Sequence, residues 1–197
     1  MTAVSEARGG LGACCASMAD LIEVLMEEHL HVLMVLNAVE RVRGAGPGQP
    51  PTHLDVLEAA VEFLRVQVDG AHHGKEEAGL FAAMEAAGLP PSATPVGCML
   101  HQHVRGRELT ESMARAIDGA RRGDADAQEA LRLSAGEYVR VLAPHIQMED
   151  YVVYPLARRA ISADALARLG ERLVDPAELA AFADAARAID AAASRAP

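Results

Sequence analysis

The sequence predicts an all-α protein, an antiparallel up-down four-helix bundle with extra helices at its C-terminal end. Only 3% of its 197 residues are aromatic, none is Trp, and 51% are hydrophobic. This composition, dominated by Ala, Leu and Val, favours helices over strands. Apolar residues also recur at helical spacing over four long stretches, which Gly- and Pro-containing breaks separate. The length corresponds to one domain with a substantial core.

The first predicted helix begins near Asp20, with Glu23 three residues later as its capping-box partner. It ends at the loop 44–51, whose sequence GAGPGQPP contains helix-breaking residues throughout. The second helix is predicted to start after Thr52, a suitable N-cap, and to continue to about Ala87.

Thr94, followed by a proline, is predicted to open the third helix, which ends at the RRGD break of residues 121–124. The fourth helix should run from near Asp126 to about Ala160. Pro144 lies inside it and should kink it, because proline lacks a backbone donor.

These elements divide the chain into three segments. Residues 1–17 are predicted to be a flexible N-terminal arm, residues 18–160 the bundle, and residues 161–197 a C-terminal helical extension. In that extension Ser162 should cap a short helix, and Asp175 should open a last, Ala-rich one.

Charge and composition argue against several classes of partner. The net charge is −10 and Lys75 is the only lysine, so we expect neither nucleic acid nor an anionic membrane as a partner. No apolar run is long enough for a membrane span, and the N-terminus does not resemble a signal peptide, so we expect a cytoplasmic protein. Cys14, Cys15 and Cys98 form neither a disulfide framework nor a CxxC metal motif, and are interpreted as ordinary thiols.

Each long helix carries a histidine on its apolar face near mid-length. The four are His29, His72, His103 and His145. Glu76 and Glu149 follow two of them by four residues, and therefore lie on the same helix faces. Burying two carboxylates without a cation would cost several kcal/mol each, so we interpret these six residues as a metal centre.

The donor types narrow the choice of metal. Imidazole and carboxylate suit iron, zinc, manganese or copper, and no thiolate is placed to select a softer metal. Six protein ligands are too many for one tetrahedral zinc ion. Carboxylates from different helices can bridge two ions, so a pair of non-haem iron ions fits best.

The order His29, His72-x-x-x-Glu76, His103, His145-x-x-x-Glu149 resembles the hemerythrin-like, or HHE cation-binding, family of di-iron four-helix bundles. The resemblance covers roughly residues 20–160 and is most evident in the segments HHGKEEAGLF and HIQMEDYVVYP. It implies that the four histidines are terminal iron ligands and that the two glutamates bridge the irons. It also implies O₂, H₂O₂ or NO as the small-molecule partner and leaves the electron donor open.

The sequence departs from the family at Arg107, where O₂-carrying hemerythrins have a second third-helix histidine. A missing ligand, with an arginine near the centre, favours peroxide-handling, catalase-like chemistry over reversible O₂ carriage. Tyr138, two turns before His145, is a further candidate catalytic residue, although core packing also explains it. The alternative function is a non-catalytic module that senses O₂, redox state or NO, or binds iron. Ferritin-like storage ranks lower, because only Glu28 and His31 show the Glu-x-x-His spacing.

The ligand register also has rivals, because the pair His73 and Glu77 has the same spacing as His72 and Glu76, and Asp150 adjoins Glu149. Superposing the two His–Glu segments favours His72 and Glu76. The remaining histidines, His31, His53 and His101, are interpreted as exposed or partly exposed. Asp69 is either an outer hydrogen-bond partner of a ligand or a solvated helix residue, and Tyr154 is expected to pack as Phe81 does.

Overall fold

The computed structural model describes residues 20–195 and contains only helices and their connections in that range, which confirms the all-α prediction. The predicted N-terminal arm, with Cys14 and Cys15, lies outside the described residues. Cys98 is exposed and has a free thiol.

The first helix, α1 (Leu21–Val42), begins where the sequence predicts. The Asp20 side chain accepts a hydrogen bond from the backbone N–H of Glu23 at 3.0 Å. The second stretch is composite, with α2 (Leu54–Phe63), η1 (Leu64–His72), α3 (His73–Lys75), η2 (Glu76–Phe81) and α4 (Ala82–Ala86). Its predicted cap is wrong, because His53 precedes the helix and the Thr52 hydroxyl instead donates to the Val42 carbonyl at 3.4 Å.

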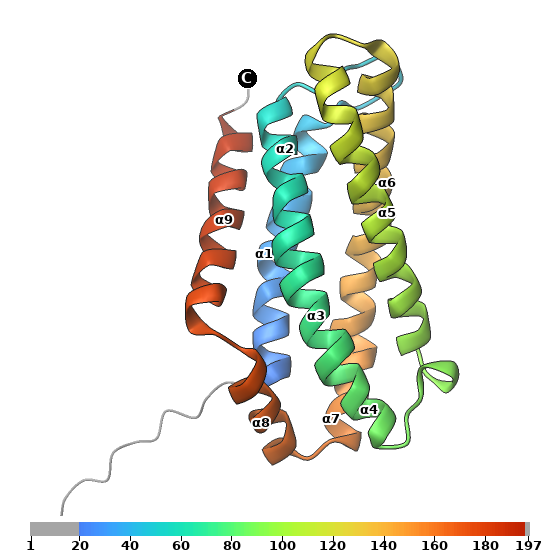
Figure 1. Ribbon diagram of the computed structural model, residues 1–197, viewed down its shortest axis with the longest axis vertical. Coiled ribbons are helices and arrows are strands. Elements are labelled where there is room, and N and C mark those ends of the chain that lie inside the picture. The colour runs from blue at the N-terminus through green and yellow to red at the C-terminus, as the bar shows by residue number, and fades with distance from the viewer. Residues whose placement is uncertain (1–19, 196–197) are drawn as a thin grey trace, which may run out of the picture.

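A short helix, η3 (Pro91–Ala93), leads into α5 (Val96–Arg121). The predicted cap at Thr94 is also wrong, because Pro95 precedes the helix and the Thr94 hydroxyl donates to the Pro90 carbonyl. The fourth stretch consists of α6 (Ala125–Met148), η4 (Glu149–Val153) and α7 (Tyr154–Ala160). Pro144 lies inside α6. The four long stretches lie side by side and run in alternating directions (Figure 1).

Two further helices, α8 (Ala163–Leu173) and α9 (Pro176–Ser194), begin at the predicted caps Ser162 and Asp175. Helix α9 packs along α1 and α2 (Figure 1). Its buried Phe182 meets Phe63 of α2 edge-on, with 4.9 Å between ring centroids. The C-terminal segment therefore contributes side chains to the same core as the long helices.

The core consists of two apolar clusters, one on each side of a polar layer. One cluster occupies the 32–42, 56–68, 109–120 and 131–146 portions of the four stretches and includes α9. The other occupies the 21–25, 80–84, 96–99 and 153–161 portions, with Leu166 of α8. Along each stretch, the buried histidines and acids fall at or near the junction between these portions. The polar layer is thus enclosed by apolar side chains above and below.

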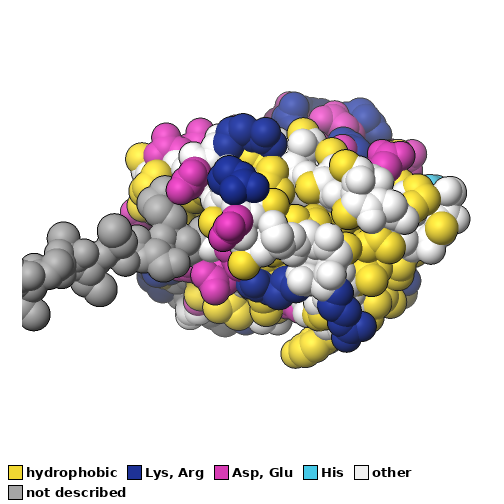
Figure 2. Space-filling view, turned by 90° about the horizontal axis from the view of Figure 1, so that it is seen from below, with side chains coloured by type: hydrophobic (Ala, Val, Ile, Leu, Met, Phe, Trp, Pro, Cys, Tyr) yellow, Lys and Arg dark blue, Asp and Glu magenta, His cyan; other side chains and the backbone are white. Residues whose placement is uncertain are grey.

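The surface carries both signs of charge. Figure 2 shows basic, acidic and apolar side chains interspersed on the end of the molecule that lies lowest in Figure 1. No helix within residues 20–195 combines the length and hydropathy that crossing a membrane requires.

Candidate metal centre

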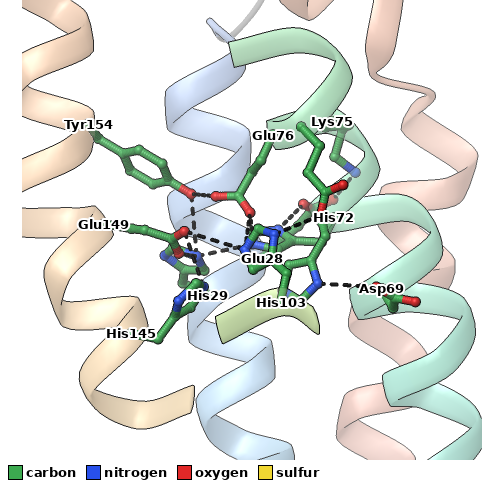
Figure 3. A network of polar contacts seen from close by, with 12 residues as sticks. Glu28, His29, Asp69, His72, Lys75, Glu76, His103, His145, Glu149 and Tyr154 are labelled. Carbon is green, nitrogen blue, oxygen red and sulfur yellow. Dashed lines mark hydrogen bonds and ion pairs between the residues drawn. The ribbon is translucent and has the colours of Figure 1, made fainter. Parts of the chain in front are cut away.

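The polar layer brings together side chains from all four long stretches (Figure 3). Five histidines and two glutamates form its centre, and each is at most 3% exposed. These residues are His29, His72, His73, Glu76, His103, His145 and Glu149. The six predicted ligands therefore lie together, and a seventh residue, His73, joins them.

The seven residues form two groups in which the possible ligand atoms all lie within 4.8 Å of one another. The three-histidine cluster contains His73, His103 and His145 with Glu76. The two-histidine cluster contains His29 and His72 with Glu76 and Glu149. Glu76 belongs to both, and Glu149 also lies 3.1 Å from Nε2 of His145. The two carboxylates consequently lie between the clusters.

The sequence treats His72 and His73 as alternative ligands, but in the structure both histidines face the centre. They lie where η1, a π-helix, gives way to a single α-turn. A π-helix closes its hydrogen bonds over five residues, so consecutive side chains are closer in angle than in an α-helix. The two adjacent rings can therefore serve different clusters, and His73 lies where it could take the place of the histidine that is missing at Arg107. Glu77 and Asp150, the rival acids, lie outside the clusters as partners of His103 and His29.

Every clustered histidine has a polar partner at Nδ1. The partner is a carboxylate oxygen for four of them: Asp150 for His29, Glu28 for His72, Asp69 for His73 and Glu77 for His103. The partner of His145 is the amide oxygen of Gln102. The distances range from 2.7 Å for His29 to 3.5 Å for His73. An Nδ1–H that donates outward leaves Nε2 as the free base, which is the usual arrangement of metal-bound histidine.

The inward atoms fit a cation, because five of them have no hydrogen-bond partner among the described residues 20–195. They are Oε2 of Glu76, Nε2 of His103, Nε2 of His145, and both carboxylate oxygens of Glu149. An unsatisfied buried polar atom costs about 1–3 kcal/mol, and more when charged. Metal ions coordinated by these oxygens and nitrogens would remove that cost.

Without metal, the centre holds protons. Burial, reinforced by the nearby Glu149 carboxylate, raises the pKa of Glu76 well above its ordinary value. Burial acts to raise the pKa of Glu149 too, but the histidines around it hold that pKa well below the usual range. Burial opposes protonation of His29, yet Asp150 and Glu149 together raise its pKa to about 9. Burial lowers the pKa of His73 to about 4.

Metal uptake at pH 7 is therefore expected to release protons. His29, with a pKa of about 9, is protonated at pH 7 in the metal-free protein, and the raised pKa of Glu76 favours its protonated form, whereas metal binding requires free Nε2 and ionised carboxylate. Metal affinity should consequently fall as pH decreases. The measurement is the absorbance of a pH indicator during titration with a divalent metal in weakly buffered solution. Uptake without proton release at pH 7 would contradict this assignment.

Tyr154 contacts the centre, contrary to the expectation that it only packs. Its hydroxyl donates to Oε1 of Glu76 at 2.6 Å and lies 3.4 Å from Nε2 of His29. Its ring stacks on that of His29 with 5.5 Å between centroids. One oxygen of Glu76 is thereby occupied, and the other is among the unsatisfied atoms.

Replacing Tyr154 with phenylalanine should lower the stability of the metal-free protein by about 1–3 kcal/mol, because a buried carboxyl oxygen loses its donor. The measurement is urea unfolding in the presence of a chelator. Tyr151→Phe is the matched control, since Tyr151 is 79% exposed. Equal losses in both variants would contradict a specific role of the Tyr154 hydroxyl.

The two predicted catalytic residues lie outside the clusters. Arg107 was expected to reach the centre, but its guanidinium pairs with Asp69 at 2.6 Å and Glu77 at 3.3 Å, and its side chain is 39% exposed. Tyr138 is buried in the core, as its packing interpretation predicts. Both line a cavity of about 280 Å³ that His73 also borders.

Sequence reasoning missed Glu28 and Lys75. Glu28 is 2% exposed and joins His72 to Lys75, which is 2.7 Å from its other oxygen. The signal was available: Glu28 precedes His29 directly, and the only lysine of the chain lies one turn after His72. A helix-face analysis at α-helical spacing could not pair them, because they belong to different helices.

Comparison with known proteins supports the metal interpretation. Residues 20–157 match the Hemerythrin HHE cation binding domain family. The chain is also 29% identical over 157 residues to the uncharacterized proteins Rv1995 of Mycobacterium tuberculosis and Mb2018 of Mycobacterium bovis. The matched region covers 78% of this chain but 59% of each relative. The chain thus spans about three fifths of the length of these relatives. No solved structure matches the chain significantly.

The family match covers more than two thirds of the chain and includes all five clustered histidines and both glutamates. The chain belongs to the hemerythrin HHE cation-binding domain family.

Proposed function

We propose that this protein is a hemerythrin-like four-helix bundle that holds two non-haem iron ions and binds or reacts with O₂, H₂O₂ or NO. The carrying observation is the set of unsatisfied ligand atoms on Glu76, His103, His145 and Glu149, which three of the four helical stretches direct into one buried layer. Imidazole and carboxylate donors suit iron, and Glu76 and Glu149, which lie between the two clusters, would help to hold both ions. Bound iron would supply the electrons and the open coordination position for such ligands.

The two clusters offer different numbers of histidines, three in one and two in the other. With Glu76 and Glu149 serving both positions, the two-histidine cluster, with His29 and His72, would have one protein ligand fewer and would leave more room for an exogenous ligand. On one side of these rings the surroundings are apolar, since Val32, Val68 and Ile146 lie beside them. Such a site favours a small, weakly polar molecule over a large or charged one.

Peroxide turnover is the second candidate function, and the cavity beside His73 favours it. That cavity offers polar groups from Thr110, Tyr138 and Arg107 next to the three-histidine cluster. The other argument for peroxide, a missing histidine, is weakened because His73 lies in the three-histidine cluster. Binding without turnover therefore ranks first, and a sensing or iron-binding role is consistent with it.

The deciding experiment is iron loading followed by optical spectroscopy. About two iron ions per chain, with charge-transfer absorption in the oxidised form, would support the function. Spectral changes that reverse on removal of O₂ or NO would support binding, whereas oxygen evolution from H₂O₂ would support turnover. Uptake of zinc alone, without iron, would contradict both.

A further inference from the structure

Two cationic side chains lie just outside the ligand layer, and each one is tied to a different cluster. Lys75 donates to Oε1 of Glu28 at 2.7 Å, and Oε2 of the same carboxylate lies 2.8 Å from Nδ1 of His72 (Figure 3). We call this chain of contacts the Lys75 relay. It ends on the two-histidine cluster.

The second chain of contacts, the Arg107 relay, ends on the other cluster. The Arg107 guanidinium contacts Oδ1 of Asp69 and Oε1 of Glu77. These same oxygens lie 3.5 Å from Nδ1 of His73 and 2.8 Å from Nδ1 of His103. The two histidine rings stack with 3.7 Å between centroids, so one guanidinium fixes a pair of parallel imidazoles.

The relays share no residue. The rings of His72, His73 and His103 are each oriented by the carboxylate behind them, and those carboxylates are oriented by Lys75 or Arg107. We propose that Lys75 and Arg107 are positioning residues that set the affinities of the two metal positions independently, Lys75 through Glu28 and Arg107 through Asp69 and Glu77. This inference rests on the proposed two-metal function and assigns each position its own control.

The Lys75 relay is the more sensitive of the two. Glu28 is 2% exposed and the Lys75 side chain 11%, so solvent cannot replace the ammonium. The side chains of the Arg107 relay are 30–39% exposed at Arg107, Asp69 and Glu77, and water can partly substitute for the guanidinium. Loss of Lys75 should therefore weaken its position more than loss of Arg107 weakens the other.

The test is titration of the metal-free full chain with Co²⁺, whose visible spectrum reports coordination. Wild type should bind two equivalents. Lys75→Met should retain one equivalent at wild-type affinity and bind the other about 10–100-fold more weakly, the usual effect of losing an outer partner. Arg107→Met should weaken the opposite equivalent by a smaller factor.

Paramagnetically shifted imidazole N–H resonances of the Co²⁺ protein assign each loss to a cluster. Lys75→Met should move the His72 signal and leave those of His73 and His103, and Arg107→Met should do the reverse. A merely structural defect would disturb both sets together. Lys75→Arg, which keeps the charge, should restore part of the affinity.

A double-mutant cycle that combines Lys75→Met with Glu28→Gln shows whether Lys75 acts through Glu28. On that background Lys75→Met should have little further effect, because the intermediate charge is gone. The double variant also avoids an unpaired buried carboxylate and therefore keeps the test usable if Lys75→Met fails to fold. Additive effects of the two substitutions on metal affinity would contradict the proposal that Lys75 acts through Glu28.

The titration distinguishes failure of this inference from failure of the proposed two-metal function. Two wild-type equivalents with unchanged binding in Lys75→Met, or equal losses at both positions, would overturn the inference alone. Fewer than two equivalents in wild type would overturn the two-metal function and the inference with it.

Discussion

Replacing His73 with alanine should empty the three-histidine position about as completely as replacing His103. Its ring lies 3% exposed in the layer and stacks on that of His103, and its cluster contains two other histidines and one carboxylate. Loss of a direct ligand should weaken metal binding by more than the roughly 10–100-fold that follows loss of an outer hydrogen-bond partner. The measurement is metal content per chain after gel filtration.

The matched control is His101→Ala, because His101 is exposed on the same helix as His103. It should retain wild-type metal content. Full occupancy in His73→Ala, with loss in His72→Ala, would show that only the sequence-favoured register binds metal. Arg107→His should not add a ligand, because Arg107 lies outside the clusters; it should lower occupancy by releasing Asp69 and Glu77.

Removing the metal should lower the melting temperature by about 10 °C at neutral pH. A ligand at about 1,000 times its dissociation constant stabilises the folded state by about 4 kcal/mol. For a chain of this size, each kcal/mol shifts the melting temperature by about 2–4 °C. The unsatisfied atoms of Glu76 and Glu149 supply the physical reason, since no described residue replaces the cation.

The measurement is differential scanning calorimetry of the loaded protein and of the same protein after chelation. The double variant His72→Ala/His73→Ala, which loses a ligand from each cluster, should show almost no change on chelation. Equal melting temperatures for loaded and chelated wild type would contradict the coupling of metal to this fold.

The sequence predicted the helical content and the six residues at the centre because burial and helix periodicity follow directly from residue type. Asp20, Ser162 and Asp175 cap helices as expected, because their side chains satisfy local backbone donors. At Thr52 and Thr94 the hydroxyls donate to preceding carbonyls instead, so the capping rule failed where a loop offered another partner.

The sequence predicted only part of the site, for one local and one long-range reason. The local reason is the π-helical geometry of residues 64–72, which places His73 beside His72 where α-helical spacing separates them. The long-range reason is that the partners of Arg107 and Lys75 lie on other helices. Arg107 was therefore assigned to the centre, whereas Asp69 and Glu77 hold it outside.

The charges of Lys75 and Arg107 also influence which charge on bound metal ions the buried layer favours. Six carboxylates lie in or around the centre, at Glu28, Asp69, Glu76, Glu77, Glu149 and Asp150. Within residues 20–195, the only lysine or arginine side chains paired with them are Lys75 and Arg107. With neutral histidines and ionised acids, the layer carries four net negative charges, which two divalent ions balance. Two trivalent ions would leave an excess of two positive charges in a poorly solvated interior, at an electrostatic cost. If the layer holds two iron ions as proposed, this charge balance would favour the reduced, divalent pair and would raise the midpoint potential of the centre.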